Sequence, residues 1–142
     1  MPAQEIIVEK LLKMKEYIHQ LKVIRPASYE EYLQSLTTKY AVERLLQLIV
    51  DLALDINNII LSYKGKPAAA DYFNSFIDLT DCNVLEPAFA TQIAPSSGLR
   101  NRLVHEYEEI NNQIVYNSIE KTIDMYVLYM KEIKKVIQSS SS

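Results

Sequence analysis

The chain has little of several residue types on which functional sites depend. It contains only two glycines, Gly65 and Gly98, so neither glycine-rich phosphate-binding loop, G-x-x-x-x-G-K or G-x-G-x-x-G, can be written. Its one cysteine, Cys82, excludes an internal disulfide and a cysteine-rich zinc site, and a single thiol suits a reducing cytosol. We therefore expect the protein to work without a cofactor.

An excess of basic charge and a membrane-spanning segment are also missing. Lys and Arg number 15 against 18 Asp and Glu, whereas a protein that holds nucleic acid by charge alone is usually basic. Non-specific coating of DNA is therefore disfavoured, although an enzyme that contacts a few phosphates at one local site is allowed. The N-terminus lacks a basic region followed by a short apolar run, and the most apolar stretch, residues 45–61, carries Asp51 and Asp55, which are costly inside a bilayer. We expect a soluble, cytoplasmic protein without a membrane partner.

Helical periodicity dominates the sequence. The first apolar stripe recurs at three- and four-residue steps through Ile7, Leu11, Met14, Ile18 and Leu21. Further helices are predicted over about 37–63, 69–79, 99–109 and 111–137, with shorter helical turns after Ser28 and Pro87. No window alternates as a strand does. The sequence predicts an all-α bundle of about five helices with a long central helix, in which residues 1–138 are a single domain and 139–142 a disordered tail.

The long predicted helix is apolar nearly all round, which is typical of the central helix of a bundle. Its polar residues are spaced by three or four and form one narrow stripe: Arg44, Gln47, Asp51, Asp55 and Asn58. Asp51 and Asp55 lie one turn apart and could offer two carboxylates to Mg²⁺. Such a stripe is more often a solvated face or a polar seam between helices, so we expect no metal site.

Cys82 and His19 have few of the neighbours that catalysis needs. Cys82 lies in an Asp-Cys-Asn segment without an adjacent histidine, and a bystander role is expected. His19 lies between the apolar stripe of the first helix and solvent, which favours a structural or surface role.

The segment from Leu99 to Tyr107 carries a different pattern. On a helix of about 100° per residue, Leu99, Leu103 and Ile110 fall within about 40° of one another and predict a buried stripe, with His105 on roughly the opposite side. A buried core histidine therefore fits badly. The open alternatives are an ordinary exposed histidine and a functional one, since histidine transfers protons near neutral pH.

Charge placement on this segment favours the functional alternative. We expect Arg100 and Arg102 in the first turn of the helix, where its dipole is positive, and three glutamates at its negative end: Glu106, Glu108 and Glu109. Each such misplacement costs up to about 0.3–1 kcal/mol at low salt, and a local rule broken in this way is often found at a functional site. Two cations beside the free N–H groups of a helix start would bind an anion such as phosphate.

The same segment resembles the R-x4-H-x-Y motif of the HepT family, through Arg100, His105 and Tyr107, with the polar Asn101 directly after the arginine. HepT proteins are HEPN-domain ribonuclease toxins encoded beside a small MntA-type nucleotidyltransferase antitoxin. The resemblance covers about Glu5 to Ile137. It includes residues 42–47 at the start of the central helix and the asparagine that caps the last helix.

The resemblance implies a HEPN helical bundle that dimerises through the motif helix, and a role for each motif residue. The implied activity is metal-independent endonucleolytic cleavage of RNA, in which the 2′-hydroxyl attacks the adjacent phosphate and leaves a 2′,3′-cyclic phosphate. Arg100 would hold the scissile phosphate, His105 would act as general base or acid, and Asn101 would orient the phosphate or the imidazole. Tyr107 would be the hydroxyl that the antitoxin modifies with AMP. The implied assembly is a homodimer within a larger hetero-oligomer with the MntA-like partner.

Helix geometry also favours a dimer. A lone helix places Arg100 and His105 about 140° apart, too far round to hold one phosphate comfortably. Two copies related by a two-fold axis ease this problem, and the apolar Val104 would be an interface contact.

Two other kinds of function remain open at this point. One is a non-catalytic HEPN-like binding subunit of a two-component nucleotidyltransferase, and the other is a purely structural helical adaptor. The motif is intact, which favours the nuclease over a binding subunit, and the adaptor does not explain the placement of the charges.

Overall fold

The computed structural model describes residues 2–105 and 110–140, and over these residues the chain forms seven α-helices and no strand. They are α1 (Pro2–Ile24), α2 (Tyr29–Gln34), α3 (Leu36–Tyr63), α4 (Tyr72–Asp78), α5 (Pro87–Ile93), α6 (Ser96–Val104) and α7 (Asn112–Ser140). The predicted all-α bundle with a long central helix is confirmed. The number of helices exceeds the prediction because the turns expected after Ser28 and Pro87 are the separate short helices α2 and α5, of 6 and 7 residues.

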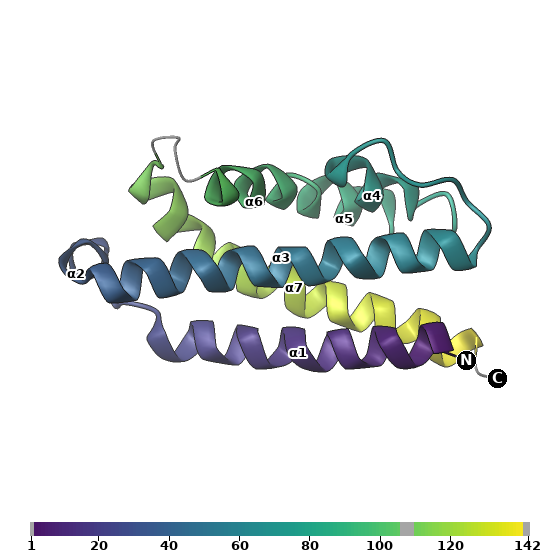
Figure 1. Ribbon diagram of the computed structural model, residues 1–142, viewed down its shortest axis with the longest axis horizontal. Coiled ribbons are helices and arrows are strands. Elements are labelled where there is room, and N and C mark those ends of the chain that lie inside the picture. The colour runs from purple at the N-terminus through teal and green to yellow at the C-terminus, as the bar shows by residue number, and fades with distance from the viewer. Residues whose placement is uncertain (1, 106–109, 141–142) are drawn as a thin grey trace.

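The helices are arranged around α3. Figure 1 shows α1 running beside α3 on one side, α4, α5 and α6 on the other side, and α7 crossing at a slant. The two ends of the chain lie at the same end of the bundle, and the short α2 lies at the opposite end. α3 contacts α1, α2, α4, α6 and α7, and the side chains that stay exposed on it include Leu36, Tyr40 and Tyr63 toward its two ends.

Burial explains the unusual composition of α3. Eleven of its residues are buried, among them Leu46, Ile49 and Ile56, which are completely inaccessible. Among the described residues, α3 is the one helix long and apolar enough to cross a membrane, but 56% of its most apolar window is buried inside the bundle. Its apolar surface is therefore used to form the protein core.

The helix ends follow local capping chemistry that the sequence indicates. Ser28 caps α2, since its Oγ accepts from the backbone N–H of Glu31 at 3.2 Å, and the Glu31 carboxylate in turn accepts from Ala27 N at 3.2 Å. Gly65, with φ of 71°, follows α3 in the left-handed conformation that ends many helices. At the other end of the chain α7 continues to Ser140, beyond Ile137, where we expected it to stop.

A buried chain of hydrogen bonds joins the core to the start of α4. The hydroxyl of Tyr129 on α7 donates to Asn57 Oδ1 at 2.6 Å, and Asn57 Nδ2 donates to Ser75 Oγ at 3.0 Å. Ser75 Oγ then donates to the carbonyl oxygen of Tyr72 at 2.7 Å. All three side chains that form this chain are fully or almost fully buried. It fixes the position of Tyr72 relative to α3, because buried polar groups without their partners are costly.

The hydroxyl of Tyr129 makes a testable contribution to stability. Replacing Tyr129→Phe leaves Asn57 Oδ1 without its donor, and we expect a loss of about 1–3 kcal/mol in the free energy of unfolding, measured by urea denaturation. The matched control Tyr63→Phe removes an exposed hydroxyl from α3 and should change stability by less than about 0.5 kcal/mol.

The same substitution has a pH signature. Burial raises the pKa of Tyr129 well above its usual value, so the folded state holds this proton more tightly than the unfolded state. The protonated hydroxyl contributes its full share to the free energy of unfolding below pH ~10, the pKa of a tyrosine in the unfolded chain. That contribution is lost as the pH rises from there through the higher pKa of the folded state. Tyr129→Phe should therefore show a shallower fall of stability above pH ~10. Equal stability of the two proteins at neutral pH, or an unchanged alkaline slope, would contradict this role.

Candidate functional site

α6 places Arg100 against the polar stripe of α3. Leu103 of α6 is buried and Leu99 packs against the core, so the helix lies on α3 by its apolar side. Arg100 then reaches Asp51, and its Nε donates to Asp51 Oδ1 at 2.6 Å. The two side chains are only 20% and 30% exposed, which makes this ion pair better shielded than an ordinary surface pair.

Three groups hold the Arg100 side chain. Besides its bond to Asp51, one Nη atom donates to Asn101 Oδ1 at 3.3 Å, and the guanidinium carbon lies 5.1 Å from the centroid of the Tyr72 ring. The second carboxylate oxygen of Asp51 accepts from Gln47 Nε2 at 3.4 Å, so the carboxylate is itself held from the other side. The orientation of the guanidinium is therefore set by an ion pair, a hydrogen bond and an aromatic face.

The guanidinium keeps part of its hydrogen-bonding capacity. It carries five N–H donors, and within residues 2–105 and 110–140 two of them are used, by Asp51 and Asn101. The remaining donors are suited to a phosphate, because the planar fork of arginine binds such anions at two points.

His105 lies at the C-terminal end of α6. Its backbone N–H donates to the carbonyl oxygen of Asn101 at 3.1 Å, and His105 is exposed to solvent. The prediction that His105 points away from the core is confirmed. An exposed imidazole suits proton transfer with a ligand that arrives from solvent.

The predicted extension of this helix to about Glu109 is wrong at His105. The backbone of His105, with φ of −83° and ψ of 77°, has already left the helical conformation, so α6 ends at Val104. A physical reason lies in the sequence that follows: three glutamates at the negative end of a helix would each destabilise it. Ile110 is accordingly not part of an α6 stripe, although it does pack against the core.

α6 starts and ends earlier than predicted, which changes where its two arginines lie along the helix. α6 begins at Ser96, which places Arg100 in its middle and Arg102 in its last turn, where a positive charge is favourable. The expected pair of arginines in the first turn is therefore wrong, and so is the anion site at the helix start. The 140° angle between Arg100 and His105, which assumed one continuous helix, does not apply either.

Tyr107 lies outside the described residues, together with the three glutamates around it. Its predicted position within about 20° of Arg100 assumed that the helix continued past His105. Since α6 ends before that residue, this angle carries no information on where Tyr107 lies.

The polar stripe of α3 is partly a seam between helices, at Asp51, and partly a solvated face, since Arg44, Asp55 and Asn58 are exposed. Asp51 pairs with Arg100 of α6, and Asp55 pairs with Lys10 of α1 at 3.3 Å. Each carboxylate thus has its own cation on a different neighbouring helix. Among the described residues, no group of three or more His, Cys, Asp or Glu side chains is placed to hold a metal ion.

Two features of the site were not found from the sequence. No pattern in the sequence singles out Tyr72, and for Asp51 the polar stripe leaves open a solvated face, a polar seam and a metal ligand. Tyr72 is 28 residues from Arg100 and Asp51 is 49 residues from it, so neither contact has a local signal. The one available hint was the polar stripe itself, which required a polar partner.

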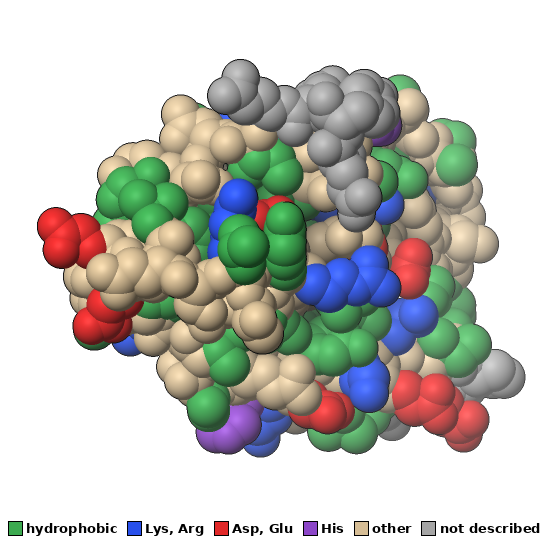
Figure 2. All heavy atoms as spheres, turned by 60° about the vertical axis from the view of Figure 1, so that its left-hand side comes forward, with side chains coloured by type: hydrophobic (Ala, Val, Ile, Leu, Met, Phe, Trp, Pro, Cys, Tyr) green, Lys and Arg blue, Asp and Glu red, His purple; other side chains and the backbone are tan. Residues whose placement is uncertain are grey.

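Positive charge gathers locally despite the net charge of −3. Figure 2 shows several Lys and Arg side chains across the middle of one face, with hydrophobic side chains and some Asp and Glu among them, while other Asp and Glu side chains lie toward its rim. Such a surface can contact a few phosphates without attracting nucleic acid along its whole length.

Comparisons with known proteins agree with this fold. A protein of Aphanizomenon flos-aquae named tRNA nuclease HepT is 40% identical over 135 residues, which cover 94% of this chain and 92% of that protein. One of Shewanella oneidensis named mRNA nuclease HepT is 24% identical over 130 residues, 92% of this chain and 97% of that protein.

The solved structures show the same architecture. A tri-AMPylated HEPN toxin of Shewanella oneidensis, in complex with an MNT antitoxin, has a TM-score of 0.83 at 24% identity over 92% of this chain and 97% of that one. Residues 14–133 match the family described as Ribonuclease HepT-like. With this match and the 40% identity to a HepT protein over nearly its whole length, the chain belongs to the HepT-like ribonuclease family.

Proposed function

We propose that the chain is an endoribonuclease toxin that cleaves RNA without a metal ion, and that an MntA-like nucleotidyltransferase is its antitoxin. The observation that carries the proposal is the state of Arg100, which is oriented by Asp51, Asn101 and Tyr72 and keeps N–H donors for a phosphate. The exposed His105 ends the same helix and adds a group that transfers protons near neutral pH. The names of the HepT relatives support RNA as the substrate.

The proposed reaction is an internal phosphoryl transfer. His105 accepts the proton of the ribose 2′-hydroxyl, the 2′-oxygen forms a bond to phosphorus, and the bond from phosphorus to the 5′-oxygen breaks. The leaving 5′-oxygen takes up a proton, so the products carry a 2′,3′-cyclic phosphate and a 5′-hydroxyl. Arg100 stabilises the charge that develops on the phosphoryl oxygens, and Asn101 orients the phosphate or the imidazole. We place this activity in the cytoplasm.

A homodimer would supply both proton-transfer groups. We propose that two copies place their α6 helices on either side of a two-fold axis, so that the partner subunit's His105 protonates the leaving oxygen. Val104, the last residue of α6, is partly exposed and is available for such a contact. Light scattering that finds a fully active monomer would contradict this arrangement.

His105→Ala should abolish RNA cleavage and leave the thermal midpoint nearly unchanged, because the residue is exposed at the end of α6. Wild-type cleavage should persist in excess EDTA, and mass spectrometry of the products should find 2′,3′-cyclic phosphate or 3′-phosphate ends. A strict requirement for Mg²⁺ would count against the histidine mechanism. Absence of cleavage by the purified wild-type protein would favour the non-catalytic binding subunit.

Asp51 should act as a positioning residue for Arg100. Asp51→Asn keeps the shape of the side chain but weakens its bond to the guanidinium, and we expect kcat for RNA cleavage to fall about tenfold, equivalent to ~1.4 kcal/mol, with a smaller change in KM. The matched control Asp55→Asn breaks the pair with Lys10, in which Asp55 is 60% exposed, and should leave cleavage unchanged. Equal effects of the two substitutions would remove this role from Asp51, and Asp51→Glu should restore part of kcat.

Neutralisation of the toxin is proposed to occur at Tyr107. Transfer of AMP to its hydroxyl would form a phosphodiester to the tyrosine oxygen and release pyrophosphate from ATP. The added phosphate would bring negative charge to the motif segment and compete with RNA for the donors of Arg100. The solved complex of a tri-AMPylated HEPN toxin with its antitoxin supports this kind of control in a relative.

Tyr107→Phe removes only the hydroxyl that would accept AMP. The variant should retain substantial RNA cleavage but escape neutralisation when the nucleotidyltransferase and ATP are supplied. Intact-mass spectrometry with peptide mapping checks this directly. Additions of AMP that map to another residue, or that remain undiminished in Tyr107→Phe, would exclude Tyr107 as the modified residue.

A further inference from the structure

A cavity of about 520 Å³ lies directly beside Arg100. It is bounded by the C-terminal half of α3, by the segment that connects α3 to α4, and by α6. Two of the residues that line it, Tyr72 and Asn101, are also the two that contact the Arg100 guanidinium besides Asp51. Any group bound in the cavity therefore lies next to the proposed phosphate site, and the volume is in the range of small-molecule pockets.

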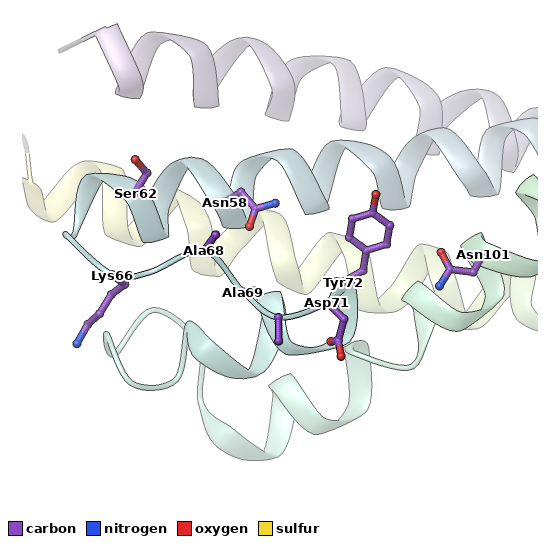
Figure 3. A pocket seen from close by; sticks show the side chains of 9 residues that line it. Asn58, Ser62, Lys66, Ala68, Ala69, Asp71, Tyr72 and Asn101 are labelled. Atoms are coloured by element: carbon purple, nitrogen blue, oxygen red, sulfur yellow. The ribbon is translucent and has the colours of Figure 1, made fainter.

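The lining of the cavity has the chemistry of a nucleobase site. Tyr72 offers an aromatic ring, and Asn58 and Asn101 each offer an amide with both a donor and an acceptor. In the view of Figure 3 the Tyr72 ring lies between the two asparagines, one on α3 and one on α6. Unpaired bases of single-stranded RNA are bound in this way, by stacking on an aromatic ring and by hydrogen bonds to their edges.

The connecting segment adds backbone groups to this lining. Residues 68–70 are three alanines with no helical or strand structure, and within the described chain their peptide groups form no hydrogen bond with another backbone group. Their short side chains leave the backbone N–H and C=O groups accessible to a ligand. The three alanines therefore offer polar backbone groups and occupy little space, which leaves room for a planar base.

Charge is arranged so that a base fits better than a phosphate in the middle of the cavity. The Asp71 carboxylate borders it but caps α4, accepting from Asn74 N at 2.7 Å and from Asn74 Nδ2 at 3.0 Å. Lys66 lies at the end of the cavity away from Asn101 (Figure 3), so positive charge flanks the cavity at both ends, with Arg100 beside Asn101. This order of cation, base site and cation follows the alternation of phosphates and bases along a single strand.

We propose that this cavity binds an unpaired purine next to the scissile phosphate, with the base stacked on Tyr72, Asn58 reading its edge, and Lys66 binding the following phosphate. Adenine is the best match, because an asparagine amide can accept from its N6 amino group and donate to N7. The cavity would thus set which RNA sequences are cleaved. The inference rests on the proposed nuclease function for its biological meaning, but the binding itself does not require cleavage.

Binding is tested with ligands that cannot be cleaved. The full-length wild-type chain is titrated with the 2′-O-methyl dinucleotides ApA and UpU, each carrying an additional 3′-phosphate so that both phosphate positions can be filled, and binding is followed by NMR of the asparagine side-chain amides. We expect ApA to bind more tightly than UpU and to shift the amide signals of Asn58 and Asn101. Asn58→Leu and Lys66→Ala should each weaken the binding of ApA at least about fivefold, as expected for loss of one base-edge or phosphate contact.

Matched controls lie on α1, on the other side of α3. Gln20→Leu removes an exposed amide and Lys15→Ala removes an exposed cation, and both should bind ApA as the wild type does. Binding of ApA that is unaffected by Asn58→Leu and Lys66→Ala, or equally weakened by the two controls, would overturn the proposal. So would equal affinity for ApA and UpU. Tyr72 is not substituted, because its ring also positions Arg100.

A cleavage assay separates this inference from the proposed function. On a library of single-stranded RNA, the wild type should cleave next to adenine. Asn58→Leu should cleave without that preference, and adding His105→Ala to this variant should still abolish its cleavage. Cleavage with an unchanged preference in Asn58→Leu would overturn the base site and leave the nuclease intact. A wild-type chain that cleaves no RNA would overturn the nuclease function, whereas the dinucleotide titration would still decide the base site.

Discussion

The fold and the site depend on one constraint, the nearly complete apolar surface of α3. A helix of this kind must be covered on most sides, and α1, α4, α6 and α7 do so. Its narrow polar stripe cannot be covered by apolar side chains without leaving carboxylates unpaired, which is costly even at partial burial. α6 therefore brings a cation to Asp51 through Arg100, whereas Asp55, which is 60% exposed, pairs with Lys10 of α1 at the solvated part of the stripe. The position of Arg100 is therefore explained by the need of the partly buried Asp51 carboxylate for a cation.

The site combines a rigid part with an accessible part. Arg100 is fixed by Asp51 and by the ring of Tyr72, and Tyr72 is in turn tied by the buried hydrogen bonds through Ser75 and Asn57 to the core. His105, at the end of α6, is exposed. A phosphate that meets donors already oriented needs little rearrangement of the protein, which is the condition for electrostatic stabilisation of a transition state. The proposed base contacts in the adjoining cavity lie on the same helices.

Local patterns in the sequence were enough to predict the long helices, the central place of α3 and the helical turn after Ser28, because each depends on residues a few positions apart. The resemblance of their spacing to the HepT motif also predicts site roles for Arg100 and His105. Local patterns could not predict that α6 ends at Val104, since the end of a helix also depends on where the chain must turn to pack its next element. The contacts of Arg100 with Asp51 and Tyr72 join residues far apart in the chain, and periodicity carries no signal for such pairs.

The most direct test of the central claim is the position of the scissile phosphate in a crystal structure of the protein with a 2′-O-methyl RNA oligonucleotide. We expect a non-bridging oxygen of one phosphate within hydrogen-bonding distance of Arg100 and an imidazole of His105, from the same or the partner subunit, near the blocked 2′-oxygen. Asp51 should keep its bond to Nε of Arg100. RNA bound on another face, with Arg100 paired only to Asp51 and no phosphate beside it, would contradict the proposed site.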